Sequence, residues 1–272
     1  GIGSEEYVKE FLNNLDKPIR LWAHAFSNQI SDASKNLLLV LASMHHATPL
    51  DVLEQSFISI QKYKSNTYGL HVNPDDFEKS LKELDGSFIK ISEIYSHCFV
   101  DFHNPSVRDF IEDYLSKYYT EVMAICNSVE FFDQCIVISK YIREIDSDSY
   151  LSQLEKRLYT NDIGDYKKGK QNFDIELRLL SLLKLYGEFK YDKIKFFTCH
   201  MLDSLIKRLN SNMGNKERIV QIVFLLLEME IGCKKKQFFE AVKSYFLNNL
   251  ENLEDFNYII SLSKINSDFL SC

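Results

Sequence analysis

Hydrophobic residues recur every three or four positions along most of the chain, which is the period of an amphipathic helix. The stretch from Asp75 to Lys117 departs from this period, because it contains two short runs rich in β-forming residues, Ser87–Ile94 and Cys98–Phe102. A polar connection joins the two runs, and a helical pattern lies on each side of them. The sequence therefore predicts helix, two-stranded ribbon and helix in this stretch, and it predicts β-structure nowhere else.

Capping residues mark several helix boundaries. Gly86 follows the last apolar turn of the first helix in this stretch, and Asn104 with the following proline suits the start of the second. Ser31 is placed to cap an earlier helix that ends near Met44 and whose central run is apolar enough to be buried on most sides. The polar segment 62–73 is predicted to be a mobile loop.

The order of elements predicts a mainly α fold with two domains. Residues 1–117 are expected to form a helical bundle and a winged helix with a small β-ribbon. Residues 118–272 show helix after helix without a fixed repeat, which is typical of an α-helical array in the form of an irregular solenoid or bundle. Within this array, the polar segment 160–172 is predicted to be a flexible loop.

Composition narrows the classes of protein to which this chain can belong. The chain is 45% hydrophobic and 13% aromatic, which excludes a disordered protein, and its net charge of −7 does not favour a nucleic-acid partner. Six cysteines occur without metal-binding spacing, so free thiols in a reducing cytoplasm are expected. No apolar run approaches the length of a membrane span. The chain begins with glycine instead of methionine, and we expect it to be a fragment of a longer protein.

Two sequence motifs are more specific than composition. They are FEKSLKELDGSFI, from Phe77 to Ile89, and VDFHNPSVRDFI, from Val100 to Ile111. Together they resemble the winged-helix region of bacterial STAND-type NTPases, the relatives of NOD-like receptors that include antiphage defence proteins. The likeness is to the novel STAND NTPase branch and covers about residues 5–117, where Trp22 also fits the entry to this region.

This resemblance implies a regulatory and sensing role. In the family, an upstream P-loop domain binds ATP and magnesium, and that domain is missing here, so we expect a non-catalytic fragment with no cofactor of its own. A histidine of the winged helix contacts nucleotide in resting STAND proteins, and His97 and His103 are candidates by location. Asn104, Arg108 and Asp109 are candidates for contact with a neighbouring domain. A simpler interpretation makes Asn104 a helix cap and the other two a solvated charge pair.

One segment imitates a phosphate-binding loop. Residues 164–170 match the spacing G-x-x-x-x-G-K, but Gln171 follows where a serine or threonine should bind magnesium. No apolar strand precedes the match, and a phosphate cradle needs a strand, a loop and a helix to aim its N–H groups. The segment is therefore predicted to be an ordinary loop, and the sequence offers no catalytic residues and no metal ligands.

Two alternatives to the sensor role remain open. A winged helix can read DNA, yet the helix in the recognition position, 75–85, carries five carboxylates against two lysines and would be repelled by phosphates. A protein partner, either a trigger or an upstream NTPase domain, is favoured over DNA. The second alternative is a scaffold whose helical half assembles oligomers.

Overall fold

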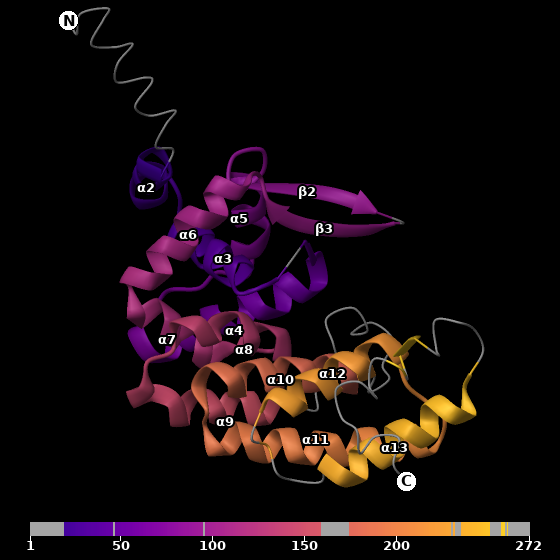
Figure 1. The fold of residues 1–272 in the computed structure, drawn as a ribbon. Coiled ribbons are helices and arrows are strands. Elements are labelled where there is room, and N and C mark those ends of the chain that lie inside the picture. The colour runs from indigo at the N-terminus through magenta and orange to yellow at the C-terminus, as the bar shows by residue number, and fades with distance from the viewer. Residues whose placement is uncertain are drawn as a thin grey trace, which may run out of the picture. The chain divides into compact units, whose positions relative to one another are not determined.

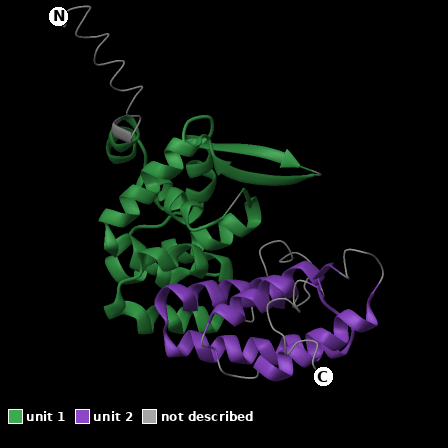
Figure 2. Ribbon diagram, viewed as in Figure 1, with its two compact units in different colours: residues 1–171 green, residues 172–272 purple. Residues whose placement is uncertain are grey.

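The computed structural model describes residues 19–45, 47–94, 96–158, 174–229, 231, 235–250, 257–258 and 260. In this part of the chain the protein is mainly helical, with one small antiparallel sheet (Figure 1). The chain divides into two compact units, residues 1–171 and 172–272 (Figure 2). The predicted loop at 160–172 and the loop-like match at 164–170 lie outside the described residues.

The first unit alternates helices with three short strands. In chain order its elements are α2 (Ile19–Asn28), α3 (Asp32–Ala42), β1 (Thr48–Pro49), α4 (Leu50–Tyr68), α5 (Asp76–Leu84), β2 (Ile89–Ile94), β3 (His97–Phe102), α6 (Pro105–Lys117), α7 (Tyr119–Ser128), α8 (Phe132–Ile138), the 3-10 segments η1 (Ser139–Tyr141) and η2 (Glu144–Asp146), and α9 (Ser147–Arg157). The predicted ribbon is confirmed as β2 and β3, with a tight connection in which Ser96 has a φ of 64°.

The sheet has three strands in the order β1–β3–β2, all antiparallel. Val100 lies at its centre, paired with Thr48 on one side and Ile91 on the other. The prediction of a ribbon with two strands missed β1, which is only two residues long and contains a proline. A strand this short has no alternating pattern to recognise, and it exists because β3 offers it an edge.

Helix α3 is the centre of the core. Its apolar run from Leu37 to Ala42 is at most 2% exposed. Helices α4, α5, α6 and α7 all pack against it. The predictions of burial on most sides and of a cap at Ser31 are confirmed, since the Ser31 hydroxyl accepts a hydrogen bond from the Ser34 amide at 3.2 Å.

Two predicted elements differ in the structure. The loop expected at 62–73 is wrong in its first half, because α4 continues to Tyr68 and ends at Gly69 in the left-handed region. Lys64 lies in these additional turns of α4, and its side chain is buried. The hydrophobic period from Val129 to Ile145 predicts a single helix, but the structure has the short helix α8 followed by η1 and η2 there.

The two compact units divide at 171/172 and not at the predicted boundary after Lys117. Helix α7 contacts α3, α4 and α6, so the chain after Lys117 continues the core of the first unit. The buried face of α7 includes Val122, Ile125 and Cys126. Residues 119–157 therefore add a second helical layer to the first unit.

The second unit is helical throughout its described residues. It contains α10 (Ile175–Phe189), α11 (Asp192–Asn210), α12 (Lys216–Glu228) and α13 (Lys235–Asn248). Helix α10 packs against both α11 and α12, and α13 packs against α11 and α12. Asp174 caps α10 by accepting from the Leu177 amide at 3.1 Å and also pairs with Arg218.

No helix in the described part of the chain is both long enough and apolar enough to cross a membrane. The expectation of free thiols is confirmed for Cys98, Cys126 and Cys135, of which only Cys98 is exposed. It is wrong for Cys199, which is disulfide-bonded.

Candidate functional site

Helix α5 presents an acidic surface whose lysines are already paired. Lys79 Nζ lies 2.8 Å from Asp75 Oδ2, and Lys82 Nζ lies 2.6 Å from Glu78 Oε1, both one helical turn apart. The hydrogen bond from Lys79 lowers the pKa of Asp75. Both lysines therefore lie beside carboxylates of their own helix, and the surface of α5 carries no excess of positive charge.

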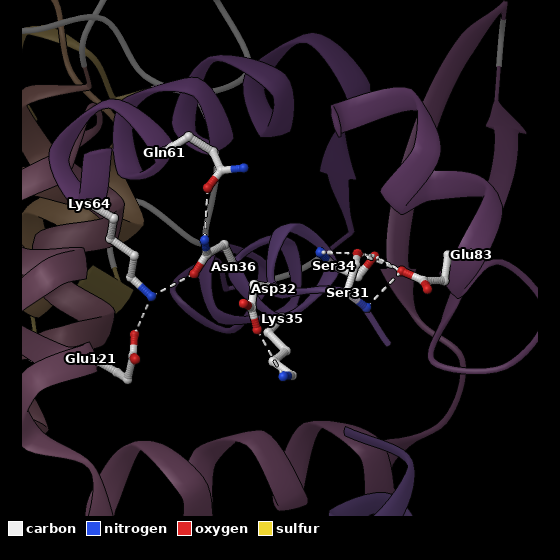
Figure 3. A network of polar contacts seen from close by, with 9 residues as sticks. All are labelled: Ser31, Asp32, Ser34, Lys35, Asn36, Gln61, Lys64, Glu83 and Glu121. Atoms are coloured by element: carbon white, nitrogen blue, oxygen red, sulfur yellow. Dashed lines mark hydrogen bonds and ion pairs between the residues drawn. The ribbon is translucent and has the colours of Figure 1, made fainter. Parts of the chain in front are cut away.

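The last carboxylate of α5 ties this helix to the start of α3. Glu83 Oε2 accepts hydrogen bonds from Ser31 Oγ at 2.7 Å, from the Ser31 amide at 3.1 Å and from Ser34 Oγ (Figure 3). Burial raises the pKa of Glu83, but the hydrogen bonds from Ser34 and Ser31 outweigh burial and lower it overall. The position of α5 against α3 thus depends on an ionised carboxylate.

A second polar network lies within the core between α3, α4 and α7 (Figure 3). Lys64 Nζ donates to Glu121 Oε2 and to Asn36 Oδ1, each at 2.5 Å. Asn36 Nδ2 then donates to Gln61 Oε1 at 2.8 Å. Asn36, Gln61 and Lys64 are 3%, 2% and 9% exposed, so this network is held away from solvent.

The ammonium of Lys64 sets the direction of every bond in this network. An ammonium can only donate, so the oxygen of the Asn36 amide must face Lys64 and its nitrogen must face Gln61. The oxygen of the Gln61 amide is consequently turned to Asn36. Gln61 Nε2 points away from Asn36 (Figure 3) and has no hydrogen-bond partner among the residues that the structure describes.

A cleft of about 420 Å³ opens between α4, α5 and the segment that joins them. Its apolar wall consists of Phe57, Ile58, Val72, Pro74 and Phe77, and its polar lining consists of Glu54, Gln61, Lys62, Ser65, Asn66 and Asn73. The rings of Phe57 and Phe77 lie 5.4 Å apart between centroids. Gln61 therefore belongs both to this α4–α5 cleft and to the buried network.

The two candidate histidines lie at opposite ends of β3. His97 is the first residue of the strand, and His103 follows its last residue. A strand of this length places them about 20 Å apart, so they cannot contact one phosphate group together. Both side chains are exposed, and the backbone amide of His103 donates to Phe88 O at 2.8 Å.

The three candidates for a domain contact lie at the start of α6. Asn104 is confirmed as the cap of α6, accepting from the Val107 amide at 3.2 Å. Arg108 Nη1 donates to Met44 O at 3.1 Å, and Arg108 Nη2 lies 3.7 Å from Asp101 Oδ1. Arg108 thus joins α6 to neighbouring parts of its own unit, while Asp109 is exposed. Their contact with another domain remains a prediction.

The residues of the cleft and the buried network were not predicted. A signal existed, because Gln61 and Lys64 share one face of α4 with the buried Phe57 and Ile60. Two polar side chains within an apolar stripe indicate buried hydrogen bonding. Their partners, Asn36 and Glu121, are 28 and 57 positions from Lys64 and could not be assigned from the sequence.

No group of histidine, cysteine, aspartate and glutamate side chains in the described residues is arranged to hold a metal ion. Comparison with models of protein families, with curated proteins and with solved structures finds no match to this chain. The candidate site therefore rests on its own geometry.

Proposed function

We propose that this chain is a non-catalytic regulatory and sensing segment of a STAND-type signalling NTPase. The order α3–β1–α4–α5–β2–β3, with β3 between the other two strands, supports a winged helix in the first unit. The likeness of residues 77–89 and 100–111 to that family supports the same assignment. The packed helices of the second unit are compatible with an irregular helical array that serves as a sensor arm.

In this proposal the winged helix couples two events. An upstream domain binds ATP and magnesium, and the helical arm recognises a protein trigger during antiphage defence in the cytoplasm of a bacterium. The network from Gln61 to Glu121 supports such coupling, because it joins the α4–α5 side of the winged helix to α7. His97 or His103 would contact the nucleotide domain, and only one of them can do so at a given phosphate.

The single observation that carries the choice of a protein partner is the paired acidic surface of α5. A helix that reads DNA needs cations free to contact phosphates. Lys79 and Lys82 instead lie against Asp75 and Glu78. The β-ribbon adds exposed Lys90, but it also adds exposed Glu93.

The competing function is a DNA-binding transcriptional regulator, which the order of elements alone would also fit. Fluorescence anisotropy of labelled duplexes of mixed sequence at low salt separates the two, because non-specific binding through phosphates is strongest there. We expect no change in anisotropy. Salt-sensitive binding that is lost when Lys79 and Lys82 are replaced by glutamine would favour the regulator.

A helical scaffold is the third possibility, and light scattering over a range of concentrations tests it. The non-catalytic assignment has its own test in an assay for release of phosphate from ATP. We expect no release above the uncatalysed rate. Turnover that copurifies with the chain and saturates with ATP would overturn the assignment.

A further inference from the structure

We propose that residues 70–82 form a lid over the α4–α5 cleft, and that this lid opens and closes about the C-terminal end of α5. These residues, the α5 lid, comprise the connection after α4 and most of α5. The inference concerns a conformational device within the first unit and does not depend on the proposed role in a STAND NTPase. It stands on where α5 is anchored and on how little holds the rest of the segment.

The C-terminal end of α5 is attached to its surroundings on several sides. Leu84 is fully buried, and its carbonyl oxygen accepts from the Phe88 amide at 3.0 Å. Glu83 accepts hydrogen bonds from the start of α3 (Figure 3), and the Gly86 amide donates to Ile89 O of β2 at 3.0 Å. Because these contacts support one another, this end of α5 is the fixed point, or pivot, of a smaller movement.

The polar contacts of the α5 lid lie almost entirely within the lid. Asp76 accepts from the backbone and the side chain of Asn73, and both ion pairs of α5 join two residues of the lid. Beyond the helical hydrogen bonds of α5, the contact to the rest of the described chain is the 3.4 Å hydrogen bond from the Leu70 amide to Lys64 O of α4. Opening the lid therefore breaks no buried polar contact.

The apolar attachment of the lid is small. Ser80 is the one buried residue of the described segment 70–82, and its hydroxyl has no hydrogen-bond partner among the described residues. Phe77 is half-buried, and its ring lies 5.4 Å from that of Phe57. The cleft of about 420 Å³ takes the place of side-chain packing between α4 and this part of α5. Few dispersion contacts are lost on opening, and the Ser80 hydroxyl gains water.

The connection between α4 and α5 can follow such a movement. Residues 71–75 are all exposed, so they can change conformation without disturbing the core. Opening would uncover Phe57, which lines the cleft and is only 3% exposed in the closed state. The first unit thus has two surfaces to present, and a partner that binds one of them more tightly shifts the equilibrium towards it.

Native-state hydrogen exchange at increasing urea concentrations tests the lid in the unaltered chain. The amides of residues 79–82 report on the lid, and those of residues 38–41 report on the core of α3. We expect the lid amides to exchange about a hundredfold faster than the α3 amides, relative to their intrinsic rates. Lid exchange should depend weakly on urea because opening exposes little surface, whereas α3 exchange should rise steeply. The Phe88 amide, at the pivot, should follow α3.

Two substitutions separate opening of the lid from unfolding of the whole unit. Phe77→Ala removes the contact with Phe57 that opening breaks, so lid exchange should rise about tenfold. Ile89→Val trims a buried side chain at the pivot, which stays packed when the lid opens. This matched variant should speed α3 exchange about fivefold and lid exchange less than about twofold.

Three results would overturn the proposal. The first is equal protection and equal urea dependence of the lid and α3 amides in the unaltered chain, which would mean that α5 leaves only when the whole unit unfolds. The second is lid exchange that rises as much as α3 exchange in Ile89→Val. The third is lid exchange that does not change in Phe77→Ala.

Discussion

The pair formed by Lys64 and Glu121 gives the sharpest prediction for stability. Replacing Glu121 by glutamine leaves the ammonium of Lys64 buried and without its anion. The side chains of Lys64 and Glu121 are 11% and 24% exposed, so the pair is mostly but not fully removed from water. We expect Glu121→Gln to destabilise the first unit, because the remaining hydrogen bond to Asn36 compensates only part of the lost interaction.

The expected magnitude lies between two limits. Breaking a fully buried pair costs about 3–5 kcal/mol, whereas an exposed pair contributes about 0–1 kcal/mol. The partial exposure of Glu121 allows water to reach the ammonium once the carboxylate is gone. We therefore expect a loss of about 2 kcal/mol in the free energy of unfolding.

Urea unfolding followed by tryptophan fluorescence measures this loss. Trp22 is the only tryptophan of the chain. Its Nε1 donates to Ser106 Oγ at 3.1 Å, and its ring lies 5.2 Å from that of Phe88. Its emission therefore reports on the first unit, and a shift of the urea midpoint with an unchanged slope gives the change in stability.

A double-mutant cycle with Lys64→Met isolates the interaction. Methionine removes the charge while keeping most of the apolar stem, so Glu121→Gln should then have an effect of less than about 0.5 kcal/mol. A coupling near zero would refute the reasoning. Equal losses from Glu121→Gln in both backgrounds would show that the buried ammonium does not depend on Glu121.

Three further predictions concern other parts of the first unit. Glu83→Gln should lower the free energy of unfolding by about 0.5–1 kcal/mol at neutral pH, since the carboxylate is partly exposed. Because the pKa of Glu83 is lowered in the folded chain, the carboxylate stabilises the fold above its ordinary pKa of 4.5, and this stabilisation is lost as pH falls through the lowered pKa. The urea midpoint should therefore depend less on pH in the variant. Gly86→Ala should lower the free energy of unfolding by about 1 kcal/mol, because φ is 74°, which a residue with a side chain rarely adopts. The added Cβ meets no atom within 4 Å, so no steric clash adds to this cost. A thermal melt of equal midpoint would contradict this prediction. Maleimide at pH 8 should modify the exposed Cys98 faster than the buried Cys126 or Cys135 in the native chain. Burial raises the pKa of the Cys126 thiol to about 11 and that of the Cys135 thiol further, so little reactive thiolate forms at either. Peptide mass spectrometry identifies the modified sites.

The parts of the fold that were predicted correctly depend on local rules. The caps at Ser31 and Asn104 were predicted because a short polar side chain bonds to an amide three residues ahead. The β-ribbon was predicted because its two strands are adjacent in sequence and rich in β-forming residues. Such features need no knowledge of distant residues.

The parts that were missed depend on contacts between distant segments. The last turns of α4 look polar, yet they are helical because Gln61 and Lys64 find buried partners on α3 and α7. Strand β1 exists because it pairs with residues about fifty positions further along the chain. The same kind of contact joins α7 to the first unit, so the change in composition after Lys117 did not mark the end of that unit.

The most direct test of the regulatory role uses the natural polypeptide that carries this sequence. It would be purified from its own source through a tag placed after Cys272, without chelator, and analysed by mass spectrometry for the residues in front of Gly1 and for bound nucleotide. The account predicts a preceding P-loop segment and a copurified adenine nucleotide. A polypeptide without a P-loop, purified free of nucleotide, would contradict it.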